Sequence, residues 1–372
     1  MKKIFSKSII LILTLALFLG GCADSSGVTE LTDGIPDTSE VFDSQTTDTD
    51  AVTSDTDEVE HDGELDEDIN MWTYSQQNGI TVRDIVIETG KGGEDIEIIQ
   101  LTDMHLSYVN DTDLLDPGIK SIYDSRNWGK NGQFLNNAVK CLEWSKTADQ
   151  TVITGDIYDY LTSEVIAQVN KYIFSAYDNI MACLGNHEAI GWSGTLEERM
   201  NILEDAWIND VYYSSKVLGN KVMLIQMDNG TRTENGEVTY FWDSQVPLLT
   251  SDLETARANG YTVLLFFHIP LATYNSKYSN AKAVMAGQGA ISYYNFATSG
   301  ACSALLGADK EIYDLITTNG DIIKGCFTGH HHSDFYTEIV ATDPSGNKAY
   351  IPQYTIMSTA YTGGHALRIT VK

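Results

Sequence analysis

The sequence is poor in positive charge. Its 372 residues include 23 lysines and arginines against 52 aspartates and glutamates, which gives a formal net charge of −29 at pH 7. A protein that binds nucleic acid needs a basic surface to meet the phosphates, so this balance argues against nucleic acid as a partner. No internal repeat is visible, which argues against a repeat architecture.

Positive charge is missing altogether from residues 23–70. This stretch contains no lysine or arginine, yet it holds 17 of the 52 acidic residues. It has too few apolar side chains to offset the entropy of ordering, so it predicts a disordered, self-repelling tether. Its single histidine, His61, is expected to be solvated. Without the tether and the three lysines that precede it, a charge of about −15 remains, so the argument against nucleic acid also holds for the rest of the chain.

Long apolar runs are also absent, apart from one near the start. Three lysines precede an uncharged apolar run over residues 9–19, and the sequence "LGGC" ends in Cys22. The run is short for a membrane span and has the layout of a secretory signal peptide. "LGGC" resembles the lipobox of bacterial lipoproteins, which implies lipidation of Cys22. We therefore expect a signal peptide over residues 1–21, a tether over residues 22–72 and an extracytoplasmic protein anchored by lipid to the bacterial cell membrane. The alternative is an ordinary cleaved signal with a chance cysteine.

Cysteine is scarce as well. Besides Cys22 the chain has Cys141, Cys183, Cys302 and Cys326. Export would permit disulfides. Cys183 and Cys326 lie within apolar runs, where buried free thiols are the more common finding. The sequence is compatible with both free and disulfide-bonded states of the four cysteines.

Residues 73–372 are long enough for one large domain, although length alone also permits two. Apolar, β-prone runs recur at residues 96–101, 151–155, 180–184, 221–227, 262–267, 322–327 and 354–359. Amphipathic helices are expected over residues 133–146, 164–177, 195–207 and 244–260, the third opened by a capping box of Thr195 and Glu198 and the fourth closed by Gly260. Strands alternating with helices predict an α/β fold, and the strand-rich later part predicts a second packed sheet.

Polar side chains follow five of these strands at the point where each strand ends. They are Asp103 and His105; Asp156 and Asp159; Asn186, His187 and Glu188; His268; and His330, His331 and His332. Ligands bind outside the carboxyl ends of strands in α/β sheets, so the five ends are expected to meet at one site. Six of the eight histidines lie in these turns, and imidazole and carboxylate groups together are typical of a transition-metal site.

These residues resemble the ordered motifs of the calcineurin-like metallophosphoesterases. The family pattern of D-x-H, G-D-x-x-D, G-N-H-D/E, a lone His and G-H-x-H matches residues 103–105, 155–159, 185–188, 268 and 329–332. The wording around the last two motifs looks closest to the phosphatase branch related to purple acid phosphatases. The resemblance implies a four-layer α/β/β/α sandwich.

The resemblance also implies the site. Asp103, His105 and His332 would hold one metal ion, Asn186, His268 and His330 a second, and Asp156 would bridge the two. Mixed nitrogen and oxygen ligands suit Mn, Fe or Zn better than Ca or Mg. Two such ions can clamp a phosphoester and activate a bound water, so the implied reaction is attack of a metal-bound hydroxide on phosphorus.

Asp159 would orient His187, which would act as general acid at the leaving group. The alternative is that Asp159 caps the following helix. Purple acid phosphatases carry a metal-binding tyrosine where this chain has Asp159, which argues against a tyrosinate–iron centre, although Tyr158 and Tyr160 lie beside it. His331 is the variable position of its motif and is expected to point away from the metals, with a substrate contact or a supporting contact to a metal ligand as the alternative. Glu188 and Asp334 are expected to support metal ligands, and His365 to be structural.

The substrate-facing loops are less informative. The long segment after His105 carries Arg126 and Lys130, and Arg126 is a candidate to hold a non-reacting phosphate. A Tyr-, Asn-, Ser- and Gly-rich stretch after His268 is expected to form a polar wall or lid, and its alternative is an exposed loop without function.

The expected function is hydrolysis of a phosphomonoester on a phosphorylated small molecule or lipid. One alternative is a phosphodiesterase acting on nucleotides, cyclic nucleotides or lipid head groups, because a fold does not fix a substrate. An alternative of another class is a non-catalytic cell-surface binding protein that keeps the fold.

Overall fold

The computed structural model describes residues 72–126, 132–188, 194–230, 232–234, 237–271 and 307–372. The expected signal peptide, the lipidation site at Cys22 and the tether up to residue 71 lie outside these ranges. Cys302, Lys130 and the segment expected to form a wall or lid after His268 also lie outside them.

The first sheet has six strands, and it carries three of the predicted strand ends. Its order is β1 (Thr73–Gln77), β2 (Ile80–Ile87), β14 (His365–Val371), β3 (Ile96–Leu101), β4 (Gln150–Thr154) and β5 (Ile180–Cys183). Strands β3, β4 and β5 are parallel to one another. Their carboxyl ends therefore lie at the same edge of the sheet.

The second sheet also has six strands and carries the other two strand ends. Its order is β12 (Phe335–Thr342), β13 (Lys348–Thr355), β11 (Ile323–Thr328), β10 (Thr262–Phe266), β7 (Val222–Met227) and β6 (Tyr213–Leu218). Strands β7, β10, β11 and β13 are parallel, and β6 and β12 run antiparallel at the two edges. A separate two-stranded ribbon joins β8 (Arg232–Glu234) and β9 (Glu237–Thr239).

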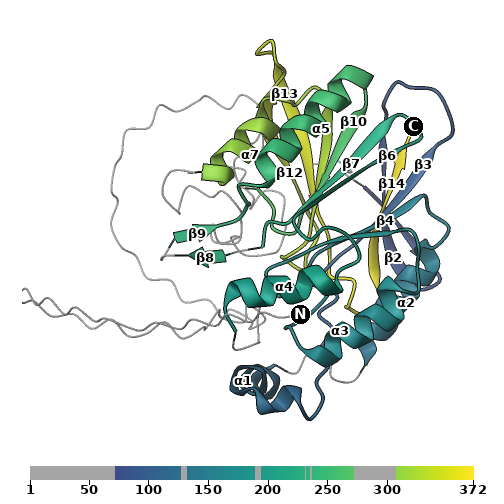
Figure 1. Cartoon of the computed structure of the whole chain (residues 1–372). Coiled ribbons are helices and arrows are strands. Elements are labelled where there is room, and N and C mark those ends of the chain that lie inside the picture. Colours follow the sequence, from purple (N-terminus) through teal and green to yellow (C-terminus); the bar gives the residue numbers. More distant parts are fainter. Residues whose placement is uncertain (1–71, 127–131, 189–193, 231, 235–236, 272–306) are drawn as a thin grey trace, which may run out of the picture. The chain divides into compact units, whose positions relative to one another are not determined.

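Helices cover the outer faces of both sheets (Figure 1). The helices are α1 (Pro117–Ser125), α2 (Gln133–Ser145), α3 (Ser163–Val169), α4 (Leu196–Ala206), α5 (Gln245–Asn259) and α7 (Gly307–Thr317), with a short 3-10 helix, η1 (Asp113–Leu115), and a π turn, η2 (Asn170–Phe174). None of the described helices is both long enough and apolar enough to cross a membrane.

Three apolar cores define the layers. One lies between the first sheet and helices α2, α3 and α4. A second lies between the second sheet and helices α5 and α7. The third lies between the sheets, where Ile98 and Val152 of the first sheet share a cluster with Leu264 and Phe327 of the second. The domain is thus an α/β/β/α sandwich, as the family resemblance implied.

Most predicted elements are confirmed, including the capping box of Thr195 and Glu198 and the left-handed cap at Gly260. Two predictions were wrong in part. The run at residues 354–359 leaves the sheet after Thr355, and the helix predicted over 164–177 passes into the π turn after Val169. Cys141, Cys183 and Cys326 are buried free thiols.

Candidate metal centre

The backbone is strained at the turns that carry the candidate ligands. Among the described residues, seven besides glycine have a positive φ, and five of these seven are candidate metal ligands: Asp103, His105, Asp156, His330 and His332, with φ between 45° and 73°. This conformation costs an L-residue roughly 1–2 kcal/mol. Such strain persists where the surrounding structure enforces it, and it concentrates at functional sites.

One cluster forms at the carboxyl ends of β3, β4 and β11. Asp103, His105, Asp156 and His332 place one potential ligand atom each within 4.8 Å of the others. The Nε2 atoms of His105 and His332 lie 2.8 Å apart, and His332 Nε2 lies 3.1 Å from Asp103 Oδ1. Four donor atoms from three strand ends therefore point at one small volume.

A second cluster shares Asp156 with the first. Asp156, His268 and His330 meet the same distance criterion. His268 Nε2 lies 3.2 Å from Asp156 Oδ2 and 3.1 Å from Asn186 Oδ1. The same amide oxygen lies 2.8 Å from His330 Nδ1, so Asn186 belongs to this cluster as well.

The charge at the site calls for a cation. The side chains of Asp103 and Asp156 are buried, and among the described residues no lysine or arginine forms an ion pair with either. Burying an ionised carboxylate is costly unless positive charge meets it. Burial lowers the pKa of His105 and His268, yet the adjacent aspartates outweigh it and raise these pKa values to about 10 and about 9. The carboxylates thus favour a positive charge beside them, which the protonated imidazoles supply here. The set of nitrogen and oxygen donors fits two transition-metal ions.

Outer hydrogen bonds fix which nitrogen faces a cluster in three of the four candidate ligand histidines. His268 Nδ1 lies 2.7 Å from Thr154 O, and because a carbonyl only accepts, Nδ1 carries the proton and Nε2 is left for a metal. His105 Nδ1 lies 3.2 Å from Asp159 Oδ1 and His332 Nδ1 lies 3.1 Å from the Tyr361 hydroxyl. All three rings thus turn Nε2 toward the clusters.

Asp159 is the centre of a buried network beside the clusters. Its carboxylate accepts from Ser107 Oγ at 3.0 Å and from Arg126, whose Nη2 lies 2.6 Å from Oδ1 and whose Nε lies 3.0 Å from Oδ2. His187 Nδ1 lies 2.9 Å from the backbone oxygen of Asp159 and 3.5 Å from its Oδ1. Asp159 was predicted to orient His187 through its carboxylate, but the hydrogen-bond partner of His187 is the Asp159 backbone oxygen, and the carboxylate lies closer to the candidate ligand His105. The sequence did not predict that Arg126 pairs with Asp159. A contact between Arg126 and the substrate stays a prediction.

The alternative role of Asp159 as a helix cap is wrong. Helix α3 is capped by Thr162, whose side chain accepts from Val165 N. Tyr158 packs edge to face against Trp207 in the apolar core, with ring centroids 5.5 Å apart. Tyr160 is fully buried as well, and burial raises the pKa of both tyrosines.

Other predicted residues support the turns in different ways. Glu188 is fully buried and accepts from the backbone nitrogens of Gly185 and Ile157 at 2.7 and 2.6 Å, so it joins the turns after β4 and β5. Asp334 instead binds Arg83 at 2.5 Å and Met357 N at 2.8 Å. His331 stacks edge to face on Phe335, and it belongs to neither cluster.

Two residues at the site escaped the sequence analysis. Asn229 is fully buried, and its Oδ1 accepts from the backbone nitrogens of His268 and Ile269, which fixes the turn after β10. A polar Asp-Asn-Gly directly after the apolar run of β7 was the available signal. Tyr361 had no such signal, because only the fold brings it to His332.

One family model matches most of the chain, and several solved structures are similar to it at low identity. The calcineurin-like phosphoesterase family matches residues 96–334. A solved dimetal phosphatase from Danio rerio is similar at 14% identity and a TM-score of 0.44, over 71% of this chain and 87% of that one. A structure of PhoD is similar at 10% identity and a TM-score of 0.44, over 76% of this chain and 60% of that one. A 5'-nucleotidase from Candida albicans is similar at 13% identity and a TM-score of 0.34, over 71% of this chain and 45% of that one.

At such low identity and TM-score, none of these three likenesses bears on the substrate. No sequence among the curated proteins matches the chain. The family match covers every candidate ligand from Asp103 to His332. The chain therefore belongs to the calcineurin-like phosphoesterase family and is a metal-dependent phosphoester hydrolase.

Proposed function

We propose that the protein is a binuclear phosphomonoesterase. The observation that supports this most strongly is the place of Asp156, whose carboxylate takes part in both ligand clusters. A carboxylate common to two adjacent sites is what a pair of metal ions held a few ångströms apart requires. The proposed ions are Mn, Fe or Zn, held by Asp103, His105 and His332 on one side and by Asn186, His268 and His330 on the other.

When bound, such a pair of ions polarises the phosphoester and lowers the pKa of a coordinated water. The chain's own residues would do the rest. His187 is held through Nδ1 by the backbone oxygen of Asp159, so Nε2 is the atom that would deliver a proton to the leaving alcohol oxygen. Arg126 and Ser107 hold the Asp159 carboxylate in turn, which keeps this arm of the site rigid.

The test is hydrolysis of p-nitrophenyl phosphate and bis-p-nitrophenyl phosphate by the full chain with added Mn, Fe or Zn. Wild type is expected to hydrolyse the monoester, and Asp156→Asn and His187→Ala are each expected to lose at least about a hundredfold in kcat. Asp178→Asn is the matched control, because Asp178 is exposed and lies in neither cluster. Cleavage of the diester alone would replace the proposal by a phosphodiesterase.

We also propose that the protein is a lipoprotein on the outer side of a bacterial membrane, anchored at Cys22, and that it acts on a phosphorylated small molecule or lipid. The support is the charged, apolar and small-residue order of residues 1–22 and the acidic tether that follows. Cys22→Ser is expected to move the protein from the membrane fraction to the soluble fraction. Within the family, the sequence around His268 and His330 supports the branch related to purple acid phosphatases.

A further inference from the structure

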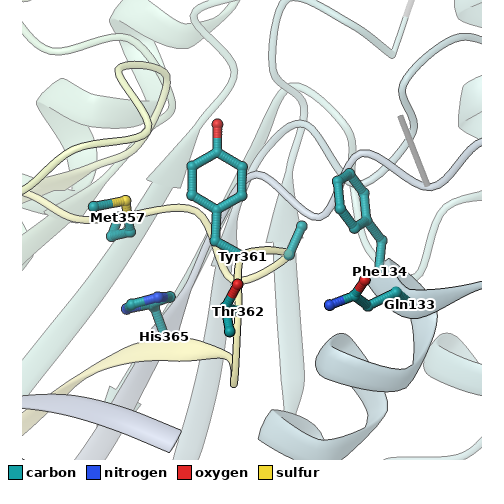
Figure 2. Close-up of a pocket in the computed structure, with 7 residues that line it drawn as sticks. Gln133, Phe134, Met357, Tyr361, Thr362 and His365 are labelled. Carbon is teal, nitrogen blue, oxygen red and sulfur yellow. The ribbon is translucent and has the colours of Figure 1, made fainter. Parts of the chain in front are cut away.

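A cavity of about 450 Å³ lies between helix α2 and the loop that joins β13 to β14 (Figure 2). Its described lining includes Gln133, Phe134, Met357, Tyr361, Thr362 and His365. Figure 2 shows Tyr361 in the middle, with Met357 and His365 on one side of it and Gln133 and Phe134 on the other. The volume falls within the range of small-molecule sites in proteins.

The cavity is built from elements that are fastened to the site. One wall is the start of helix α2, and the other is the loop that joins β13 to β14. Asn137 of α2 donates through Nδ2 to Ala360 O at 2.7 Å and to Tyr361 O at 3.0 Å. Ser358 Oγ donates to the backbone oxygen of Asp103 at 2.7 Å. The loop is thus tied both to the helix and to a candidate metal ligand, so the two walls keep a fixed relation to the metal centre.

One residue of the cavity lining contacts a candidate metal ligand. The hydroxyl of Tyr361, a lining residue, lies 3.1 Å from His332 Nδ1. The opposite edge of the same ring, Nε2, faces Asp103 at 3.1 Å. A substrate with its phosphorus at the metals would reach the cavity only with atoms that extend past His332. The cavity is therefore placed for the part of a phosphoester that is remote from phosphorus.

The described lining carries no aspartate, glutamate, lysine or arginine. His365 is neutral as well: its Nδ1 lies 3.2 Å from Nη1 of the buried Arg83, which can only donate, so the proton sits on Nε2. Burial and Arg83 together lower the pKa of His365 to about 4. A second phosphate or a carboxylate would find no countercharge here. Two aromatic rings and a thioether, with the uncharged polar groups of Gln133, Thr362 and His365 beside them, suit an uncharged aromatic group instead.

We propose that this cavity is the specificity site of the enzyme and that it takes an uncharged aromatic group at the end of the alcohol part of the substrate. The proposal rests on the proposed function, because it assumes that the phosphate lies at the metals. It adds the substrate class: phosphate esters in which a short flexible linker joins the phosphate to an aromatic ring.

The test compares ω-phenylalkyl phosphates, with linkers of two to five methylenes, against the n-alkyl phosphates of equal linker length. All are esters of primary alcohols with similar leaving groups, so differences in kcat/KM report binding of the ring. The full chain loaded with Mn is expected to favour the phenyl compound by about tenfold at the linker length that passes His332, and less at shorter lengths. Thr362→Trp, at an exposed position of the lining, is expected to fill the cavity and abolish this preference. Thr255→Trp is the control, since Thr255 is exposed on helix α5 and lies outside the lining.

An equal loss for both compounds in Thr362→Trp, or no phenyl preference in wild type at any length, would overturn the proposal. The same series of phenylalkyl and alkyl phosphonates, titrated by calorimetry, gives a readout that does not depend on turnover. If none of the phosphates is hydrolysed, the proposed function fails. The cavity assignment then stands or falls on whether Thr362→Trp removes the tighter binding of the phenyl phosphonates.

Discussion

Two bidentate arginine–aspartate pairs among the described residues differ in burial, and they allow a controlled test of the network beside the metal centre. In the first, Arg126 binds Asp159, and the side chains are 29% and 0% exposed. In the second, Arg257 binds Asp321 through contacts of 2.6 and 2.9 Å, and the side chains are 38% and 33% exposed. The chemistry of the two pairs is the same, so a difference in their contribution to stability measures burial.

We predict that Arg126→Met destabilises the protein by about 2–4 kcal/mol, because it leaves a buried carboxylate without its strongest donor. This loss of unfolding free energy is at or below the loss that is typical when one partner of a buried ion pair is removed, because Ser107, His105 and His187 still contact Asp159. Arg257→Met removes an exposed pair and is expected to cost less than about 1 kcal/mol. Salt at about 1 M should reduce the Arg257 effect more than the Arg126 effect.

The assay is urea unfolding of the metal-free full chain, followed by tryptophan fluorescence. Burial raises the pKa of the Asp159 carboxyl, but hydrogen bonds from His105, His187 and Arg126 outweigh it and hold this pKa well below its usual value. The contribution of Arg126 is therefore complete above about pH 4, the ordinary pKa of an aspartate, and is lost as the pH falls further. Equal destabilisation by the two substitutions at pH 7, or a gap between wild type and Arg126→Met that widens in acid, would refute the reasoning.

Three further predictions concern the metal centre. Tyr361→Phe removes the acceptor for His332 Nδ1 and should weaken metal binding about tenfold in calorimetry. The control Tyr172→Phe, at an exposed position, should not weaken it, and equal affinities of the two variants would contradict the role of Tyr361. Gly329→Ala would push a Cβ into Thr102 Oγ1 and Asp103 Oδ2, so it should lower the metal content measured by mass spectrometry. The control Gly92→Ala, in open space, should leave the metal content unchanged. A full metal content in Gly329→Ala would contradict the close packing at Gly329. Mn at about a thousand times its Kd should raise the free energy of unfolding by about 4 kcal/mol, and a chelator should reverse this increase. If Mn does not shift the denaturation curve, the result contradicts a preformed metal site.

The sequence could predict the ligands because each follows a strand. An apolar run that ends in a charged or imidazole side chain can be recognised from a few neighbouring residues. Parallel strands of one sheet then bring their carboxyl ends together, whatever the order of the strands in the chain. The positions of Asp103, Asp156 and His268 after three such strands thus predicted that they meet at one site, although β10 belongs to a different sheet from β3 and β4. The strong patterning of strands and helices also predicted an α/β fold with a second packed sheet, while the four-layer order came from the family resemblance.

The residues that support the ligands could not be predicted in the same way. Tyr361 reaches His332, and Arg126 reaches Asp159, only through loops whose path depends on long-range contacts. Residues 356–359 continue a β-prone run, yet they leave the sheet because Ser358 and Thr359 bind the backbone next to Asp103. Local propensity thus gave way to tertiary hydrogen bonds at the point where the site is assembled.

The most direct test of the binuclear centre is the metal content per chain, measured by mass spectrometry after reconstitution with Mn, Fe or Zn and removal of excess metal, alongside turnover of p-nitrophenyl phosphate. The account predicts two ions per chain in wild type and markedly fewer, with turnover lost, in Asp156→Asn, because this carboxylate takes part in both clusters. A wild-type protein that turns over the monoester fully with one ion or none would contradict it.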